Sequence, residues 1–145
     1  MESRDTVIPD DLDKVFLKAS SLFRSYNIGA SRLSVLKGLS LDIKRQEKLF
    51  LRGASGAGKS TLLYTLAGLE RPDSGSVKID GKSLYALSNT EQTKFRNTKI
   101  GYVFQNYFLL PDLNALENVL VPSMIGGYKN NKERLRIHLG SRSRI

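Results

Sequence analysis

One stretch decides the fold of this chain: Gly53-Ala54-Ser55-Gly56-Ala57-Gly58-Lys59-Ser60-Thr61. It fits the pattern G-x-x-x-x-G-K-[ST] at every defined position. The apolar run from Leu49 to Leu51 precedes it and predicts a buried parallel strand. Apolar residues at helical spacing follow it, and Gly68 is placed to end that helix in a left-handed cap. A strand, a loop and a helix in this order form the context that a phosphate-binding loop requires.

The residue types of this loop suit phosphate chemistry. Glycines let the backbone curl so that successive N–H groups point at phosphate oxygens, and the helix N-terminus adds its positive dipole end. We expect Lys59 to reach the β- and γ-phosphates as a catalytic residue and the Ser60 hydroxyl to ligate Mg²⁺. An ordinary glycine-rich turn would need neither a lysine nor a hydroxyl at these positions. The predicted nucleotide-binding residues of the loop are Gly53, Ala54, Ser55, Gly56, Ala57, Gly58, Lys59, Ser60 and Thr61.

Composition limits the function classes. With 145 residues, 40% of them hydrophobic and 26% charged, the chain suits one ordinary globular domain. It has no cysteine, which excludes disulfides and thiol chemistry, and the single His138 cannot form a histidine metal cluster. No apolar run approaches the ~20 residues of a membrane span, and the first residues lack the layout of a signal peptide. We therefore expect a cytosolic protein whose metal is Mg²⁺ brought by a nucleotide.

Positive charge is concentrated near the end of the chain. The net charge is +9, and six Lys/Arg against one Glu give residues 123–145 a charge of +5. A basic tail can contact nucleic acid or anionic lipid, but here it has no interleaved aromatic residues and no recognisable reading motif. The sequence therefore does not favour a nucleic-acid partner.

An antiparallel β region is predicted before the phosphate loop. Residues 1–13 read as a loose polar leader. The expected strands of this region are 14–18, 22–26 and, after a flexible turn at 27–30, 35–43. After the first helix we expect a turn at 71–75, a short exposed strand with Val77 and Ile79, and a hairpin turn at Asp80-Gly81.

Two further helices are predicted from capping signals. Ser88 to Glu91 matches a capping box, which predicts a short helix through Phe95 before a loop at 97–98. A strand is then expected over Ile100 to Phe104. Asn114 to Glu117 predicts another helix start, with an apolar stripe of Leu116, Val119 and Leu120, ended by Gly126-Gly127. Residues 128–145 read as a basic, disordered tail.

Several motifs together resemble one family. A GTPase is not favoured, because Arg134 in Asn131-Lys132-Glu133-Arg134 stands where a guanine-binding motif needs a carboxylate. Instead, residues 14–127 resemble the ATP-binding subunits of ABC transporters. The resemblance rests on residues 35–41, on the phosphate loop as a Walker A motif, on 69–75, and on 100–105 as a Q-loop. Residues 109–119 narrow it to the branch that contains the lipoprotein-releasing and macrolide-export ATPases.

This resemblance implies an α/β P-loop NTPase fold: a partial ABC ATPase domain with an antiparallel β subdomain and the start of a helical subdomain. It implies that ATP and Mg²⁺ bind, that Tyr26 stacks on adenine, and that Gln105 contacts Mg²⁺ or the attacking water as a catalytic residue. The alternatives are that Tyr26 is a core tyrosine and that Gln105 is an amide at a strand end.

The resemblance also implies an integral membrane transporter subunit as a partner, contacted through residues 105–120, at the cytoplasmic face of the inner membrane. Four successive apolar residues, Tyr107 to Leu110, suit such a docking surface, although burial in a small core is the alternative. Full-length relatives dimerise, whereas we expect no ATP-driven dimer of this chain.

Motifs of the family's second half are missing from this chain. The sequence holds no L-S-G-G-Q, no apolar strand that ends in Asp-Glu, and no switch histidine, since His138 lies in the basic tail. We therefore expect a truncated or frame-shifted subunit. Two hypotheses stay open. The first is an ATP-binding subunit that couples MgATP binding and hydrolysis to export of a lipoprotein-like or amphipathic substrate, and that is hydrolysis-deficient in this form. The second is a non-catalytic fragment that binds nucleotide or the membrane subunit.

Overall fold

A long β-hairpin opens the structure. The computed structural model describes residues 14–125. Strands β1 (Val15–Ile28) and β2 (Ser31–Lys44) pair antiparallel and are joined by a two-residue turn at Gly29-Ala30. The predicted strands 14–18 and 22–26 are thus one strand, with a bulge around Ser21. The backbone N–H of Ser21 donates to Ser40 Oγ at 2.8 Å, so the bulge leaves this donor satisfied.

Two shorter strands complete the sheet. Strands β3 (Ser74–Ile79) and β4 (Lys82–Ser83) give the order β2-β1-β3-β4, with every pair antiparallel. The predicted hairpin turn at Asp80-Gly81 is confirmed. The expectation of an exposed strand is wrong, because Val77 and Ile79 are 0% and 3% exposed. Pairing with β1 and β4 places β3 inside the sheet, so its apolar side chains reach the core.

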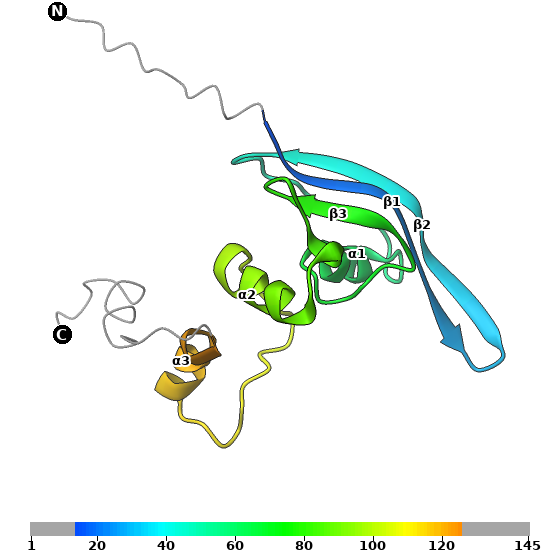
Figure 1. Ribbon diagram of the computed structural model, residues 1–145. Helices are drawn as coiled ribbons and strands as arrows, with labels where there is room; N and C mark the ends of the chain where they lie inside the picture. Colours follow the sequence, from blue (N-terminus) through cyan, green and yellow to red (C-terminus); the bar gives the residue numbers. More distant parts are fainter. Residues whose placement is uncertain (1–13, 126–145) are drawn as a thin grey trace, which may run out of the picture. The chain divides into compact units, whose positions relative to one another are not determined.

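Helix α1 (Lys59–Leu66) covers the sheet (Figure 1). Its buried residues share the core with the sheet and with the short 3-10 helix η1 (Leu84–Ala86). The large apolar side chains that are fully buried are Leu22, Val77 and Leu84. The predicted left-handed cap is confirmed: Gly68 has φ +70°, and the N–H groups of Gly68 and Leu69 donate to Thr65 O and Tyr64 O.

Both predicted strands next to the site motifs are wrong. Residues 49–51 and 100–104 have no strand structure. Phe50 is 83% exposed and Val103 is 96% exposed. A strand needs a neighbour that pairs its N–H and C=O groups, and a parallel strand also needs cover on both faces. Among residues 14–125 the sheet contains only the four antiparallel strands above, so these apolar runs lack strand neighbours there.

Two compact units divide the chain between Gln92 and Thr93. Helix α2 (Asn89–Lys99) begins with the predicted capping box: the N–H and Oγ of Ser88 donate to Glu91 Oε2 at 2.9 and 2.6 Å. The helix runs to Lys99, so the predicted loop at 97–98 is wrong. Thr98 Oγ1 donates to Lys94 O at 2.8 Å, which satisfies this hydroxyl inside the last turn.

Helix α3 (Ala115–Ile125) lies in the second unit. Its predicted start is confirmed, since Asn114 N donates to Glu117 Oε2 at 2.8 Å and Glu117 N donates to Asn114 Oδ1 at 3.0 Å. None of its residues is buried, and Leu116 and Val119 are each 54% exposed. The predicted leader, the break at 126–127 and the tail lie outside the described residues. Within 14–125, no helix has the length and hydrophobicity to cross a bilayer.

Candidate functional site

The phosphate loop runs directly into helix α1. Gly58 is the N-cap of this helix and has φ +82°, a left-handed conformation that side chains rarely adopt. A Cβ atom built on Gly58 would lie 2.7 Å from Val35 Cγ1 on β2. Glycine at this position therefore lets the loop both reverse direction and pass close to the sheet.

Lys59 points back over the loop that precedes it. Its Nζ donates to Gly53 O at 2.9 Å and to Ala54 O at 2.6 Å. Residues 53–57 are exposed, so an incoming anion can reach this ammonium group. The first turn of α1 contains no acidic residue and no side-chain cap. The positive end of the helix is therefore free of a local counter-charge, which suits phosphate binding.

Ser60 follows Lys59 on the first turn and is exposed. A hydroxyl oxygen is a ligand type that Mg²⁺ accepts together with phosphate oxygens and water. Among the residues described, no group of three or more His, Cys, Asp or Glu could hold a metal ion. The exposed hydroxyl of Ser60 fits a Mg²⁺ ion that also takes phosphate oxygens and water as ligands. Gln105 lies in an exposed loop of the second unit, and its part in metal binding stays a prediction.

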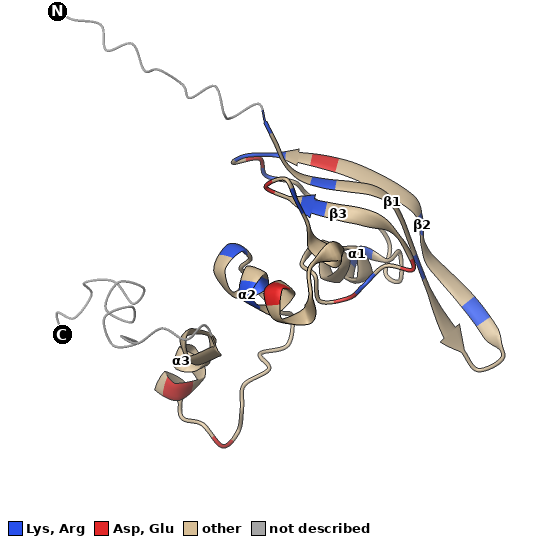
Figure 2. Cartoon of the chain, in the orientation of Figure 1, with Lys and Arg blue, Asp and Glu red and all other residues tan. Residues whose placement is uncertain are grey.

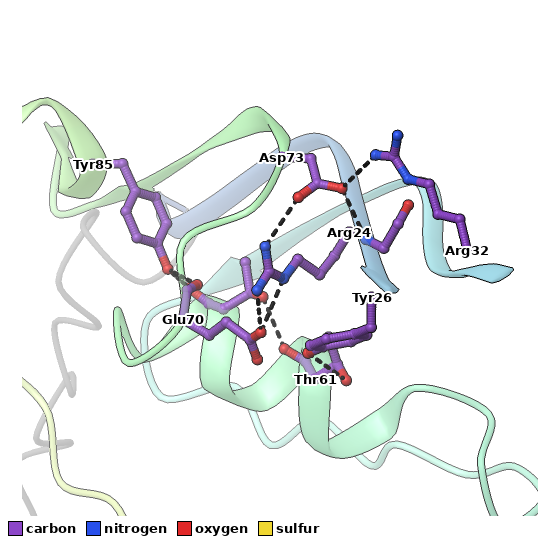
Figure 3. Close-up of polar contacts among 9 residues, drawn as sticks. Arg24, Tyr26, Arg32, Thr61, Glu70, Asp73 and Tyr85 are labelled. Carbon is purple, nitrogen blue, oxygen red and sulfur yellow. Dashed lines mark hydrogen bonds and ion pairs between the residues drawn. The ribbon is translucent and has the colours of Figure 1, made fainter. Parts of the chain in front are cut away.

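Tyr26 lies close to the phosphate loop although the two are far apart in sequence. It is half-buried on β1, and its hydroxyl donates to Thr61 Oγ1 at 3.4 Å (Figure 3). Tyr26 is therefore not one of the fully buried core residues. The structure brings Tyr26 and Thr61, two of the predicted nucleotide-binding residues, to one place.

Arg24 is held by two carboxylates. Its Nε and Nη2 donate to Glu70 Oε1 at 2.9 and 2.7 Å, and its Nη1 donates to Asp73 Oδ1 at 3.0 Å. Glu70 and Asp73 come from the turn that follows α1, so these bonds join β1 to the far end of the helix (Figure 3). The hydrogen bonds to Glu70 raise the pKa of Arg24 above its ordinary value, despite partial burial.

Three groups donate hydrogen bonds to the Asp73 carboxylate. Besides Arg24, the backbone N–H of Ser25 donates to its Oδ2 at 2.8 Å, and Arg32 Nη2 donates to the same atom at 3.3 Å. Partial removal from water would raise the pKa of Asp73, but the hydrogen bonds, first that from Arg24, outweigh it and lower the pKa below its ordinary value. Asp73 therefore stays ionised and keeps the arginine in place at neutral pH.

The sequence analysis missed Arg24, Glu70 and Asp73. Arg24 and Tyr26 are two residues apart on one strand, and this spacing puts side chains on the same face. That signal was present in the sequence. The partnership with Glu70 and Asp73 was not, because it depends on how β1 packs beside the turn after α1.

The second unit contains a groove of about 490 Å³. It is lined by Leu109, Leu110, Pro111, Leu113, Ala115, Asn118 and Val119. Asn118 shapes it: its Nδ2 donates to Leu113 O at 2.9 Å and its Oδ1 accepts from Leu110 N at 2.8 Å. The four residues Tyr107 to Leu110 are exposed, and Tyr107 is 91% exposed. The alternative expectation that they are buried in a small core is therefore wrong.

Known proteins resemble this chain over most of its length. Residues 36–143 match the family model described as "ABC transporter". The match extends into 128–145, so the domain boundary placed at 127 stays a prediction. Similar relatives are two proteins named "Lipoprotein-releasing system ATP-binding protein LolD". The one from Bdellovibrio bacteriovorus is 45% identical over 77% of this chain and 50% of its own length. The one from Myxococcus xanthus is 43% identical over 87% of this chain and 59% of its own length. The chain thus spans about half the length of these relatives.

Solved structures show the same fold. A dimeric post-hydrolysis structure of the ATP-binding cassette MJ0796 bound to ADP and Pi matches with a TM-score of 0.72 and 39% identity, over 76% of this chain and 47% of that one. An ATP-binding subunit of an ABC transporter matches with a TM-score of 0.65 and 26% identity, over 86% of this chain and 49% of that one. The fold is that of an ABC ATPase, a P-loop NTPase, of which the chain covers part. From its phosphate loop, its fold and these matches, the chain belongs to the ABC transporter family.

Proposed function

We propose that this chain binds MgATP as part of the ATP-binding subunit of a lipoprotein-releasing type of ABC transporter. The observation that carries the proposal is the position of Lys59, which begins α1 and turns its ammonium group onto the exposed loop of residues 53–57. In this proposal the loop N–H groups and Lys59 bind the phosphates, the Ser60 hydroxyl is a ligand of Mg²⁺, and Tyr26 faces the adenine. A part for Gln105 in metal binding is the expectation from the family resemblance. The family and the phosphate loop support this assignment.

Calorimetric titration of the purified chain with ATP in the presence of Mg²⁺ tests it. Lys59→Ala is expected to abolish binding, because it removes the cation that meets the β- and γ-phosphates. Lys48→Ala is the matched control, since it removes an exposed lysine that precedes the loop in sequence and should leave the affinity unchanged. Equal affinity of the wild type and Lys59→Ala would contradict the assignment.

We also propose that this chain alone does not turn ATP over and does not form an ATP-driven dimer. Preorganised electrostatic partners stabilise the charge that develops on the transferred phosphoryl group, and losing one commonly costs about 10²–10³ in rate. The 145 residues contain no L-S-G-G-Q and no Asp-Glu pair, so a second copy of them supplies neither motif. Phosphate release that is robust in the wild type and lost in Lys59→Ala would refute this part of the proposal, as would an ATP-dependent rise in mass by light scattering.

The groove of the second unit supports a membrane-associated role. We propose that it receives a cytoplasmic segment of the membrane subunit of a lipoprotein-releasing system, which would hold this chain at the cytoplasmic face of the inner membrane.

The charge distribution does not favour nucleic acid as the partner. Acidic residues are interspersed with basic ones on β2, at the end of β3 and on α2 (Figure 2).

The matched pair Val119→Arg and Leu116→Arg tests this docking role. Both residues lie on α3 and are 54% exposed, but only Val119 lines the groove. In co-purification with the membrane subunits of such a system, Val119→Arg should lose the partner and Leu116→Arg should retain it. Equal retention by both variants would mean that the groove is not the docking site.

A further inference from the structure

Tyr26 has one ring face occupied by a neighbour. The Arg24 guanidinium carbon lies 4.9 Å from the centroid of the Tyr26 ring, over its face. A planar ring has two faces, so a base that stacks on Tyr26 must use the other one. The arginine therefore lies behind the face on which a nucleotide base would stack.

The arginine is itself held firmly. Three of its N–H groups are used by Glu70 and Asp73, which fixes the plane of the guanidinium as well as its position. Arg24 and Glu70 are each partly buried, with 26% and 19% of their side chains exposed, so this pair is less screened by water than the exposed ion pairs of the chain. A fixed cation over one face of an aromatic ring attracts the ring and limits its tilt.

The ring has a second point of attachment. Its hydroxyl donates to Thr61 Oγ1 at 3.4 Å, in the first turn of α1. One contact thus fixes the face of the ring and the other fixes its edge. Both contacts connect the Tyr26 ring to α1. The Tyr26 hydroxyl contacts the first turn of the helix, and Arg24 bonds to Glu70 in the turn that follows the helix (Figure 3).

We propose that Arg24 is a positioning residue for the nucleotide base, which it serves by holding Tyr26 as a stacking platform at a set distance from the phosphate loop. This inference rests on the proposed ATP site and adds to it a residue that touches the ring and not the nucleotide. Glu70 and Asp73 act through Arg24.

Another arginine, directly after β2, provides a matched control. Arg45 lies 4.8 Å over the ring of Phe16 and donates to Asp80 at 2.7 Å, which repeats the arrangement of a guanidinium, a ring and a carboxylate. Arg45 lies near the open end of the β1–β2 hairpin, whereas Tyr26 pairs with Leu33 near its turn. About ten residues of strand separate the two places, or roughly 30 Å at ~3.3 Å per residue.

The experiment compares ATP with inorganic tripolyphosphate by calorimetry on the full chain, for the wild type, Arg24→Met, Arg24→Lys and Arg45→Met. Arg24→Met is expected to bind ATP about three- to tenfold more weakly and tripolyphosphate as the wild type does, because only the base contact is loosened. Arg24→Lys keeps the charge but not the planar guanidinium, so its ATP affinity should lie between those of the wild type and Arg24→Met. Arg45→Met should match the wild type with both ligands.

The chain contains no tryptophan, so Tyr26→Trp supplies a single fluorescent reporter of base stacking. ATP should quench this reporter, and adding Arg24→Lys or Arg24→Met should reduce the quenching at saturating ATP. If Arg24→Met does not fold, the Arg24→Lys variant carries both measurements.

The outcomes separate the two proposals. If the wild type binds neither ATP nor tripolyphosphate, the proposed function fails and this inference fails with it. If the wild type binds ATP but the Arg24 variants bind it equally well, the inference alone is overturned. A loss of ATP and tripolyphosphate binding by the same factor also overturns it, because Arg24 then supports the phosphate loop and not the base.

Discussion

Two separate constraints favour glycine at position 58: a left-handed backbone and the close approach of β2. A pair of substitutions can measure each constraint separately. The φ of +82° at Gly58 disfavours any side chain, and a Cβ atom would meet Val35 Cγ1 at 2.7 Å. Gly56 in the same loop has φ +78° but no heavy atom within 4 Å of an added Cβ. Gly56→Ala is expected to lower the free energy of unfolding by about 1–2 kcal/mol, the cost of a left-handed residue, and Gly58→Ala by more than that.

Urea denaturation of both variants provides the measurement, with ATP affinity as the second readout. Only Gly58→Ala adds the steric contact with β2, so the difference between the variants isolates it. Equal loss of stability in the two variants would show that β2 and the loop can move apart at no cost. At this scale the sequence was informative: the loop, its lysine and its hydroxyl were all predicted from residue types alone.

At the scale of elements, the capping box of α2 makes helix stability depend on pH. The Ser88 side chain and then its backbone N–H donate to Glu91 and lower the pKa of this carboxyl below its ordinary value of 4.5. A lowered folded-state pKa contributes stability above pH 4.5, and this contribution is lost as the pH falls through the lower pKa. Ser88→Ala should cost about 1 kcal/mol at neutral pH.

Amide hydrogen exchange in the first turn of α2 checks this. The exchange rates of the wild type should rise as the pH falls below 4.5, after correction for the intrinsic rate, and those of Ser88→Ala should already be raised at neutral pH. Thr90→Ala, in the same turn, is the control and should behave like the wild type. Ser88→Ala should weaken this pH dependence without removing it, because the backbone N–H of residue 88 still donates to Glu91. A pH dependence of the same size in Ser88→Ala would assign it to another group.

Local signals explain which elements were predictable. The predictable elements are the caps at Ser88 and Asn114 and the turn at Asp80-Gly81. All the interacting residues of each lie within three or four positions of one another, so a short segment contains the whole signal. The strands expected at 49–51 and 100–104 depend on distant neighbours that pattern alone does not supply. The merging of two predicted strands into β1 likewise came from its pairing with both β2 and β3.

At the scale of the whole molecule, the exposed apolar runs should govern solution behaviour. Phe50 and Val103 are 83% and 96% exposed, whereas Val77 is fully buried. Exposed apolar segments with unpaired backbone groups bind hydrophobic dyes and promote aggregation. Phe50→Lys and Val103→Lys are therefore expected to reduce dye fluorescence and turbidity with little change in melting temperature.

Val77→Lys is the contrasting variant, because it places a charge in the core and should unfold the first unit. Thermal melts and the fluorescence of 8-anilinonaphthalene-1-sulfonate measure both effects. A large fall in melting temperature caused by Phe50→Lys or Val103→Lys would mean that these side chains are packed in solution.

The pairing of β1 with β3 also has a kinetic consequence. Leu17 pairs with Ile79 and Ala19 with Val77, so this contact closes a long stretch of chain, and the phosphate loop lies inside that stretch. The β1–β2 hairpin closes a turn of two residues and can form early. Once it has formed, joining β3 must still overcome the entropy of the 29-residue connection between Lys44, which ends β2, and Ser74, which begins β3. We therefore expect the phosphate loop, which lies in this connection, to take its shape late in folding, after β3 has joined β1. With that order, a nucleotide that binds the loop is expected to slow unfolding and to leave the folding rate unchanged.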